Sequence, residues 1–271
     1  MRIGLLTDLH LDDAGKEASW HNPYDFDGAL DRVAGALDHF AAERVDVVAV
    51  CGDVAHHGAH ALPARLDALL AAVPVPVVAV TGNHDGGPAA LSAALPSSRA
   101  GLPAGESLAG LRLAGVHAGA EGADASALVD PPAIERWDAE PVVLLSHFPL
   151  VSHAERLGAR GLRYPGDVHE HRAHAAVLER RATPTVVLSG HIHARDAQCG
   201  ERILQLTQAA LIEAPYECAV LDVEADDGEV AVRRRARLLA GPPPPGPLPV
   251  ISPAEERFRW TAAGGWVAGD G

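Results

Sequence analysis

Short apolar runs recur along the chain and predict buried β-strands. Five of them are rich in Val, Leu, Ile and Ala, and polar residues or glycine bound each one. They cover residues 2–7, 45–51, 75–81, 142–146 and 185–189. Strands that are apolar on both faces are typical of sheets covered by other layers on both sides. The pattern therefore predicts a sheet inside an α/β protein.

Helical periodicity appears between the predicted strands. In residues 25–44 the apolar positions follow a 4-3-4-3 spacing, which predicts an amphipathic helix with Asp25 or Asp27 as its cap. Residues 62–72, with Pro63 near the start, and residues 168–181 are further helix candidates. The order is therefore strand, helix, strand, repeated.

The pattern changes after Gly200 to strands without intervening helices. Residues 203–207, 217–223 and 229–238 alternate as strands do, and Asp226-Asp227-Gly228 is typical of a hairpin turn. We expect these strands to add to a second sheet. The basic run Arg233-Arg234-Arg235 lies within the last of them and is interpreted as a solvated face.

Residues 241–247 read Gly-Pro-Pro-Pro-Pro-Gly-Pro, a stiff linker. They divide the chain into a predicted domain at 1–240 and a tail at 241–271. The sequence leaves open whether the tail docks on the body or on another subunit. Residues 86–140 predict only a strand at 111–117 and otherwise resemble an insertion.

Composition limits the classes of partner. The formal charge of −14 disfavours extended nucleic acid, which needs clustered cations to neutralise phosphates. The first residues already read as a strand rather than a signal peptide, and there is no apolar run of membrane-spanning length. Three scattered cysteines do not make a disulfide framework. We expect a cytoplasmic protein with no membrane partner, in which Cys51 belongs to the core.

Candidate chemistry lies at the carboxyl end of each of the five strands. The strands end in Asp8-Leu9-His10, Gly52-Asp53, Gly82-Asn83-His84-Asp85, His147 and Gly190-His191-Ile192-His193. In open α/β sheets, ligands bind where the carboxyl ends of strands converge. Each motif alone is weak evidence, but five of them in order predict one shared site.

This ordered set resembles the motifs D-x-H, G-D, G-N-H-[DE], H and G-H-x-H of the calcineurin-like metallophosphoesterases, over about residues 2–223. The resemblance implies a four-layer α/β/β/α sandwich, with two mixed sheets flanked by helices and two metal ions at the strand ends. Carried over by position, one metal takes Asp8, His10, Asp53 and His193. The other takes Asp53, Asn83, His147 and His191, so that Asp53 bridges the two.

The chemistry of these residue types agrees with that implication. Imidazole, carboxylate and amide ligands suit two divalent or mixed-valence ions of Mn, Fe or Zn. Two cations sharing a carboxylate and a water-derived hydroxide grip a phosphate and lower the pKa of the attacking water. The expected nucleophile is therefore hydroxide. His84 is the candidate acid for the leaving oxygen; the alternative is a supporting histidine held by Asp85, whose carboxylate could also fix the loop.

Other polar residues receive weaker interpretations. His56, His57 and His60 follow the Gly-Asp motif and are interpreted as exposed loop histidines. The segment 150–167 is expected to recognise substrate, because an arginine fork there could hold a phosphate or carboxylate. It contains Arg156, Arg160, Arg163 and Tyr164.

The leading hypothesis is a dinuclear metal-dependent phosphoesterase acting on a small phosphorylated substrate, with diesters favoured over monoesters. A phosphomonoesterase of the same family and a noncatalytic metal-binding scaffold are the alternatives. A protein phosphatase is disfavoured, because Gly52-Asp-Val-Ala-His-His-Gly departs from the family's G-D-x-x-D-R-G. Nuclease activity is disfavoured by the acidic charge.

Overall fold

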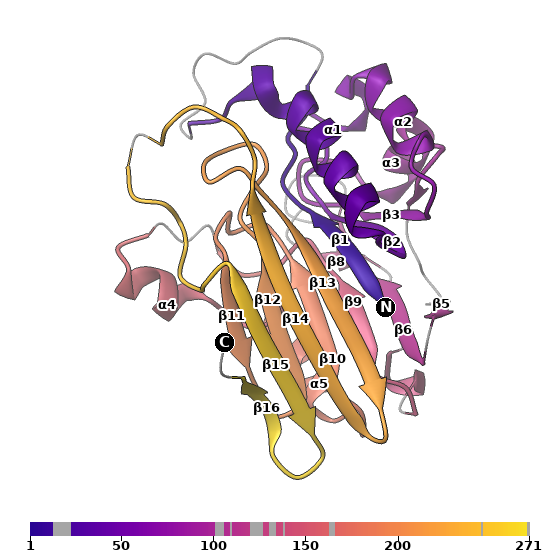
Figure 1. Cartoon of the computed structure of the whole chain (residues 1–271), viewed down its shortest axis with the longest axis vertical. Helices are drawn as coiled ribbons and strands as arrows, with labels where there is room; N and C mark the ends of the chain where they lie inside the picture. Colours follow the sequence, from indigo (N-terminus) through magenta and orange to yellow (C-terminus); the bar gives the residue numbers. More distant parts are fainter. Residues whose placement is uncertain are drawn as a thin grey trace.

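The computed structural model describes residues 1–12, 23–100, 106–108, 110–119, 127–129, 134–137, 139–162, 166–244 and 246–269. Across these residues the strands form two mixed sheets, with helices on the outer faces (Figure 1). A two-stranded sheet of β7 (His117–Ala118) and β8 (Leu128–Val129) lies beside them. The expected four-layer α/β/β/α sandwich is confirmed.

The larger sheet has eight strands in the order β16-β15-β14-β13-β1-β2-β3-β4. β1, β2, β3 and β4 run parallel to one another, whereas β13 pairs antiparallel with β1 and continues into an antiparallel meander. The bounds are β1 (Arg2–Leu6), β2 (Val47–Cys51), β3 (Val77–Val80), β4 (Arg99–Ala100), β13 (Glu217–Asp226), β14 (Glu229–Leu238), β15 (Glu255–Thr261) and β16 (Gly265–Ala268).

The smaller sheet has six strands in the order β11-β12-β10-β9-β6-β5. Its central strands β6, β9, β10 and β12 are parallel, and antiparallel edge strands flank them. The bounds are β5 (Glu106–Leu108), β6 (Leu111–Gly115), β9 (Val142–Leu145), β10 (Thr185–Ser189), β11 (Asp196–Cys199) and β12 (Ile203–Thr207). Both sheets therefore present a set of parallel carboxyl ends.

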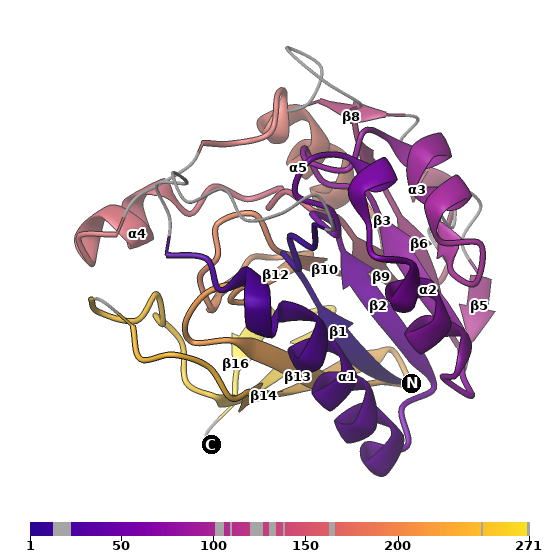
Figure 2. The same ribbon diagram turned by 90° about the horizontal axis from the view of Figure 1, so that it is seen from above.

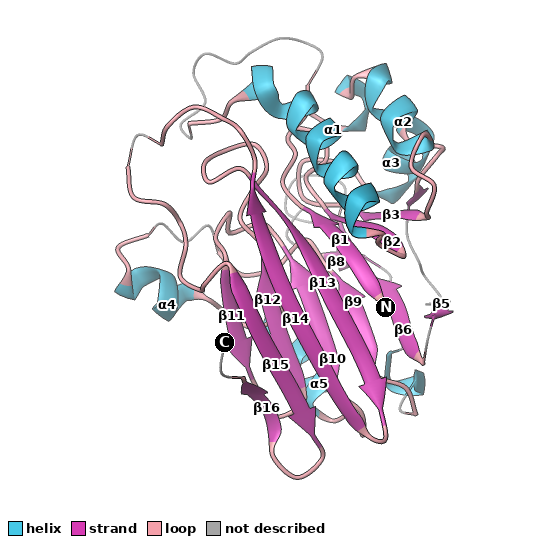
Figure 3. Cartoon of the chain, in the orientation of Figure 1, coloured by secondary structure: helices cyan, strands magenta, loops and turns pink. Residues whose placement is uncertain are grey.

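Helices cover the outer faces of the two sheets (Figures 2 and 3). α1, α2 and α3 pack on the eight-stranded sheet, whereas α5 packs on the six-stranded one. The bounds are α1 (Phe26–Glu43), α2 (Ala64–Ala71), α3 (Pro88–Ala94), α4 (Ala154–Ala159) and α5 (His171–Glu179), with short 3-10 helices η1 (Ala59–Ala61) and η3 (Ile134–Trp137). None of the helices in the described ranges has the length and apolar character needed to cross a membrane.

The α1 helix shows how the apolar pattern becomes packing. The predicted stripe turns Val33, Leu37 and Phe40 toward the sheet. The Phe40 ring lies directly over Gly4 of β1, where a Cβ atom would stand 2.6 Å from the ring. Arg44 ends the helix in a left-handed conformation; its N–H donates to the carbonyl of Ala41, and the N–H of Val45 donates to that of Phe40.

The main core lies between the two sheets. Inward-facing residues of both sheets meet there, among them Leu5 and Ala49 from one sheet and Leu145 and Leu188 from the other. Cys51 is buried in this layer, as expected. Separate apolar clusters lie under the helices on each side. The strands are therefore buried on both faces, which explains their continuous apolar runs.

The predicted strands are present, but their division between the sheets differs from the expectation. Residues 203–207 form β12 of the six-stranded sheet, whereas β13 and β14 join the sheet that contains β1. β13 places Leu221 opposite Ile3 and Ala219 opposite Leu5, so its apolar residues continue the inner face of β1. The segment 86–140, interpreted as an insertion, contains α3 and five strands within its described residues.

The tail docks on the body, which answers the question that the sequence left open. β15 pairs with β14 along its length, and β16 pairs with β15. The indole N–H of Trp260 donates to the carbonyl of Glu201 at 2.9 Å, and that of Trp266 donates to Arg202 at 3.2 Å. The predicted boundary between residues 240 and 241 therefore separates segments that share one sheet.

The interpretation of the basic run as a solvated face is wrong for its central residue. Arg234 is fully buried, and its guanidinium donates to the carbonyls of Asp196 at 3.1 Å and Thr207 at 2.8 Å and pairs with Glu256. Because side chains alternate along a strand, Arg233 points to the opposite face and pairs with Glu255. Arg234 thus joins the eight-stranded sheet to the six-stranded sheet.

We predict that Arg234→Ala lowers the free energy of unfolding by about 3–5 kcal/mol, because it leaves Glu256 and two buried carbonyls without a partner. Arg233→Ala, which removes an exposed ion pair from the same strand, serves as the control and should cost less than about 1 kcal/mol. Urea unfolding followed by circular dichroism measures both. Equal losses in the two variants would show that the contacts of Arg234 with the six-stranded sheet do not stabilise the fold.

Candidate metal centre

The parallel strands of both sheets deliver their carboxyl ends to one region. The predicted site residues follow β1, β2, β3, β9 and β10 in the chain. Asp8, His10, Asp53 and His147 are buried, whereas Asn83, His84, His191 and His193 are partly exposed. The structure therefore brings side chains from two sheets to a single site.

One group of side chains surrounds the carboxylate of Asp8. Nε2 of His193 lies 3.3 Å from Oδ1 of Asp8, and the rings of His193 and His10 are 5.4 Å apart. Nε2 of His10 in turn lies 3.5 Å from Oδ2 of Asp53. Potential ligand atoms of Asp8, His10 and His193 all fall within 4.8 Å of one another, as one ion requires.

A second group shares Asp53. Nε2 of His147 lies 3.3 Å from Oδ2 of Asp53 and 3.1 Å from Oδ1 of Asn83. The His191 ring packs edge-on against the His147 ring at 5.1 Å. Asp53 thus lies between both groups, in the position that a bridging carboxylate needs.

The backbone at these strand ends adopts a conformation that non-glycine residues rarely occupy. Asp8, His10, Asp53, His191 and His193 have positive φ angles between 44° and 65°. Such residues cost energy and persist where the surrounding structure determines them, commonly at functional sites. Five of the seven predicted metal ligands therefore carry backbone strain, which turns their side chains inward.

Two glycines allow the loops to approach closely. A Cβ atom at Gly190 would stand 1.7 Å from Oγ1 of Thr7 and 2.3 Å from Oδ2 of Asp8. At Gly82 it would stand 2.2 Å from Oδ1 of Asp53. The glycines of the motifs therefore make room for the carboxylates.

Hydrogen bonds from the outer ring nitrogens orient two histidines. His147 donates its Nδ1–H to the carbonyl of Cys51 at 3.1 Å, and His193 donates its Nδ1–H to Oε1 of Glu213 at 2.5 Å. Each bond turns Nε2 toward the cluster, as ligand histidines require. Glu213 did not emerge from the sequence. Glu213 follows β12, which is parallel to β10. A search for polar residues after the carboxyl end of β12, as was done for the other five strands, would have included it.

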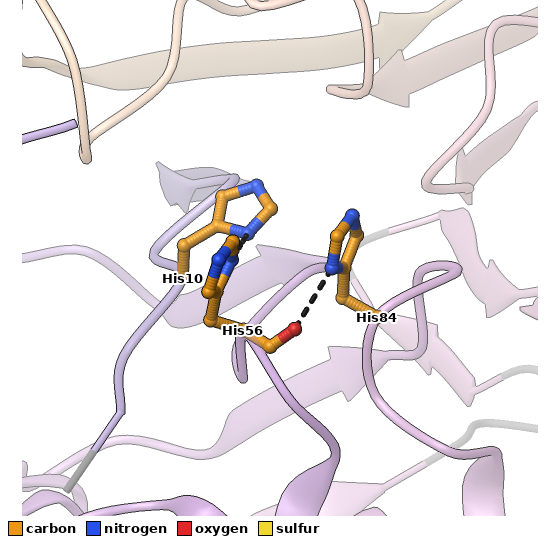
Figure 4. A group of neighbouring side chains, drawn as sticks. All are labelled: His10, His56 and His84. Carbon is orange, nitrogen blue, oxygen red and sulfur yellow. Dashed lines mark hydrogen bonds between the residues drawn. The ribbon is translucent and has the colours of Figure 1, made fainter. Parts of the chain in front are cut away.

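His56 is buried, so its interpretation as an exposed histidine is wrong, although His57 and His60 are exposed. Nδ1 of His56 lies 3.1 Å from Nδ1 of His10 (Figure 4), whereas Nε2 of His10 faces the carboxylate of Asp53. Burial, together with nearby His84, lowers the pKa of His56 to about 4. A neutral His56 ring can accept the Nδ1–H of His10, and this tautomer leaves Nε2 of His10 available to a metal ion.

His84 and Asp85 point in different directions. His84 donates its Nδ1–H to the carbonyl of His56 at 2.8 Å (Figure 4), and its backbone N–H donates to Asp53 at 2.9 Å. The buried carboxylate of Asp85 instead accepts the N–H groups of Ala55 and Gly82. Asp85 therefore turns back into the fold and fixes the loops, the second of the roles considered for it.

The cluster attracts positive charge. Burial favours the neutral form of Asp53, but contact with His147 holds the pKa of Asp53 well below its usual range. Burial also disfavours a charged His147, yet Asp53 raises the pKa of His147 to about 9. Since ligand imidazoles are neutral, cations would displace such protons on binding.

The donor set fits a pair of cations. Nε2 of His10 is buried and makes no hydrogen bond in the described part of the chain, although it faces the Asp53 carboxylate. A buried nitrogen that makes no hydrogen bond and lies beside a shared carboxylate is the arrangement expected of a metal ligand. Imidazole nitrogens, carboxylates and an amide oxygen suit borderline to hard divalent ions.

A pocket of about 740 Å³ opens on this cluster. His10, Asp53, Asn83, His84 and His191 line its floor. The predicted recognition segment 150–167 also lines the pocket, but with the side chains of Leu157 and Leu162 rather than with arginines.

The expected arginine fork takes a different role. Arg156 donates both arms to Asp196, each at 2.6 Å, which occupies the fork. Arg160 is exposed, and Arg163 and Tyr164 lie outside the described residues.

The chain resembles known proteins in both sequence and structure. The family model for calcineurin-like phosphoesterases matches residues 1–195. A dimetal phosphatase from Danio rerio superposes with a TM-score of 0.60 at 17% identity, over 86% of this chain and 95% of that one. The sulfate thiohydrolase SoxB from Thermus thermophilus superposes with a TM-score of 0.50 at 17% identity, over 88% of this chain and 56% of that one. At these identities the structures share the fold. A search of curated protein sequences finds no match.

We predict that Gly190→Ala abolishes metal binding while most of the fold remains, because the new methyl group displaces Thr7 and Asp8. Gly35→Ala is the matched control: it lies on the exposed side of α1 with no atom within 4 Å of the new Cβ, and it should be neutral or stabilise by up to about 1 kcal/mol. Elemental analysis after dialysis against metal measures binding. Full metal content in Gly190→Ala would contradict the proposed placement of the ligands.

Proposed function

The chain belongs to the calcineurin-like phosphoesterase family of metal-dependent phosphoric ester hydrolases, and from this premise we propose that it is a dinuclear phosphodiesterase for small substrates. The observation that carries the proposal is the set of contacts that His147 makes with Asp8, Asp53 and Asn83. Asp53 also faces His10, so its carboxylate lies between the two groups of histidines. A cytoplasmic location remains part of the proposal.

The ligand assignment follows the two groups. Asp8, His10, Asp53 and His193 hold one ion, and Asp53, Asn83, His147 and His191 hold the other. The short distances around Asp53 support it as the shared ligand. Mn, Fe or Zn would suit these donors. When bound, the two ions would supply Lewis-acid activation of both the phosphoryl group and the attacking water.

The residues of the chain perform the remaining steps. Glu213 and the carbonyl of Cys51 fix the rings of His193 and His147, so the ligands are oriented before substrate arrives. The bond from His84 to the His56 carbonyl holds the Nδ1 side of the His84 ring, and His84 lines the pocket. In the proposed mechanism, the Nε2–H of His84 donates its proton to the leaving oxygen.

A diester is favoured by charge. A diester carries one negative charge at neutral pH, whereas a monoester carries nearly two. Among the described lining residues of the pocket there is no lysine or arginine to neutralise the additional charge, and Asp25 and Glu213 are acidic. The same acidity, together with the net charge of −14, disfavours extended nucleic acid.

We predict that the Mn-loaded protein hydrolyses bis(p-nitrophenyl) phosphate with a higher kcat/KM than p-nitrophenyl phosphate. Asp53→Asn should abolish both activities because it weakens both ion positions together. Release of p-nitrophenolate, measured beside the metal content of each preparation, tests this. A preference for the monoester would favour a phosphomonoesterase, and stoichiometric metal without turnover of either ester would favour a noncatalytic scaffold.

We predict that His84→Ala retains both metal ions but lowers kcat about 10²- to 10⁴-fold, and most strongly for esters with poor leaving groups. The exposed His60→Ala is the control, since His60 lies in the adjacent turn and should leave kcat unchanged. The dependence of kcat on the pKa of a series of leaving phenols is the measurement. An equal slope for His84→Ala and the unmodified enzyme would remove the acid role from His84.

A further inference from the structure

One wall of the pocket comes from a segment outside the family match, which ends at residue 195. Residues 242–244 and 246–249, together called the proline strap, line the pocket through Pro242, Pro243, Pro244, Gly246, Pro247 and Pro249. The strap has little conformational freedom, because a proline-rich chain favours the extended polyproline helix. It is therefore a stiff wall rather than a loose connection between β14 and β15.

Both ends of the strap are fixed to residues near the metal site. At its start, the N–H of Leu239 donates to the carbonyl of Tyr216 at 2.7 Å, and Gly241 lies against the Tyr216 ring. At its end, the N–H of Arg195 donates to Pro249 at 3.0 Å, and the N–H of Ile251 returns to Arg195 at 2.9 Å. Arg195 lies two residues after His193, so the strap is attached to a metal-ligand loop.

The same loop anchors the neighbouring wall, which α4 provides. Next to Arg195, the buried Asp196 receives the fork of Arg156 on α4 and the hydroxyl of Ser252 at 3.3 Å. Leu157 of α4 packs with Ile192, between the two histidines of the final motif, and with Ile251. The strap, α4 and the metal-ligand loop thus form one connected unit.

The chemistry of these walls excludes a charged ligand group. Besides the prolines, Leu157, Leu162 and Ile192 supply aliphatic surface, and Tyr24 and Tyr216 supply rings. Tyr24 stacks on His193 at 5.7 Å, which continues the aromatic surface up to the metal cluster. The acidic Asp25 and Glu213 are held by Arg32 and His193. An anion at these walls would meet no lysine or arginine among the described lining residues.

We propose that the proline strap and α4 form the recognition pocket for an uncharged apolar ring carried by the phosphoester. This inference rests on the proposed function, because the phosphoryl group must lie at the metal cluster for the ring to reach these walls. Substrate selection then depends on Pro247 and its neighbours, while Arg195 and Asp196 act as positioning residues that hold both walls.

Binding of non-hydrolysable phosphonates tests the proposal without requiring turnover. Isothermal titration of the Mn-loaded protein should give a Kd for phenylphosphonate about tenfold or more below that for methylphosphonate, because the ring leaves water for an apolar wall. A carboxyphenylphosphonate should bind more weakly than phenylphosphonate. Pro247→Ser should reduce the ratio of phenyl to methyl affinity at least about threefold.

Leu248→Ser is the matched control, because Leu248 lies in the same strap, is 42% exposed and is not among the lining residues. It should keep the ratio of the unmodified protein. Equal affinity for the two phosphonates, or equal ratios in the two variants, would overturn the pocket while leaving the metal centre intact. Failure of both phosphonates to bind the metal-loaded protein would instead overturn the proposed function.

Discussion

Two carboxylates buried away from water, those of Asp8 and Asp53, impose the constraint on which the rest of the molecule depends. A buried charge is costly unless partners compensate it, and two like charges so close need positive charge between them. The histidines that converge on them supply part of it as protons when no ion is bound. The left-handed backbone at the strand ends and the motif glycines allow these polar groups to approach one another closely.

Much of the centre was predictable because it depends on local rules. Parallel strands that are apolar on both faces must be internal, and their carboxyl ends must meet, so the polar residues that follow them had to gather. This argument located Asp8, Asn83 and His191 without knowledge of how the sheets stack. It also distinguished Cys51 from the metal ligands, because Cys51 precedes Gly52 within the strand and faces the core.

What the sequence did not reveal depends on contacts between distant segments. Arg234 looks like its neighbours in the chain, and only the position of Glu256 and of the second sheet shows that it is buried. His56 resembles an ordinary loop histidine until His10 is seen beside it. The tryptophans of the tail strands and the attachment of the strap at Arg195 join residues more than 50 positions apart, and no local pattern encodes such contacts.

The position of β1 within its sheet has a consequence for how the protein is made. β1 lies between β2 and β13, and β13 is synthesised long after β1. The amino group of Met1 donates to the carbonyl of Val223, 222 residues away, at 2.7 Å. During translation one edge of β1 therefore stays unpaired until most of the chain has emerged, and exposed edges invite association with other chains. The nascent protein passes through a long interval in which a chaperone, or rapid collapse around α1, must protect that edge.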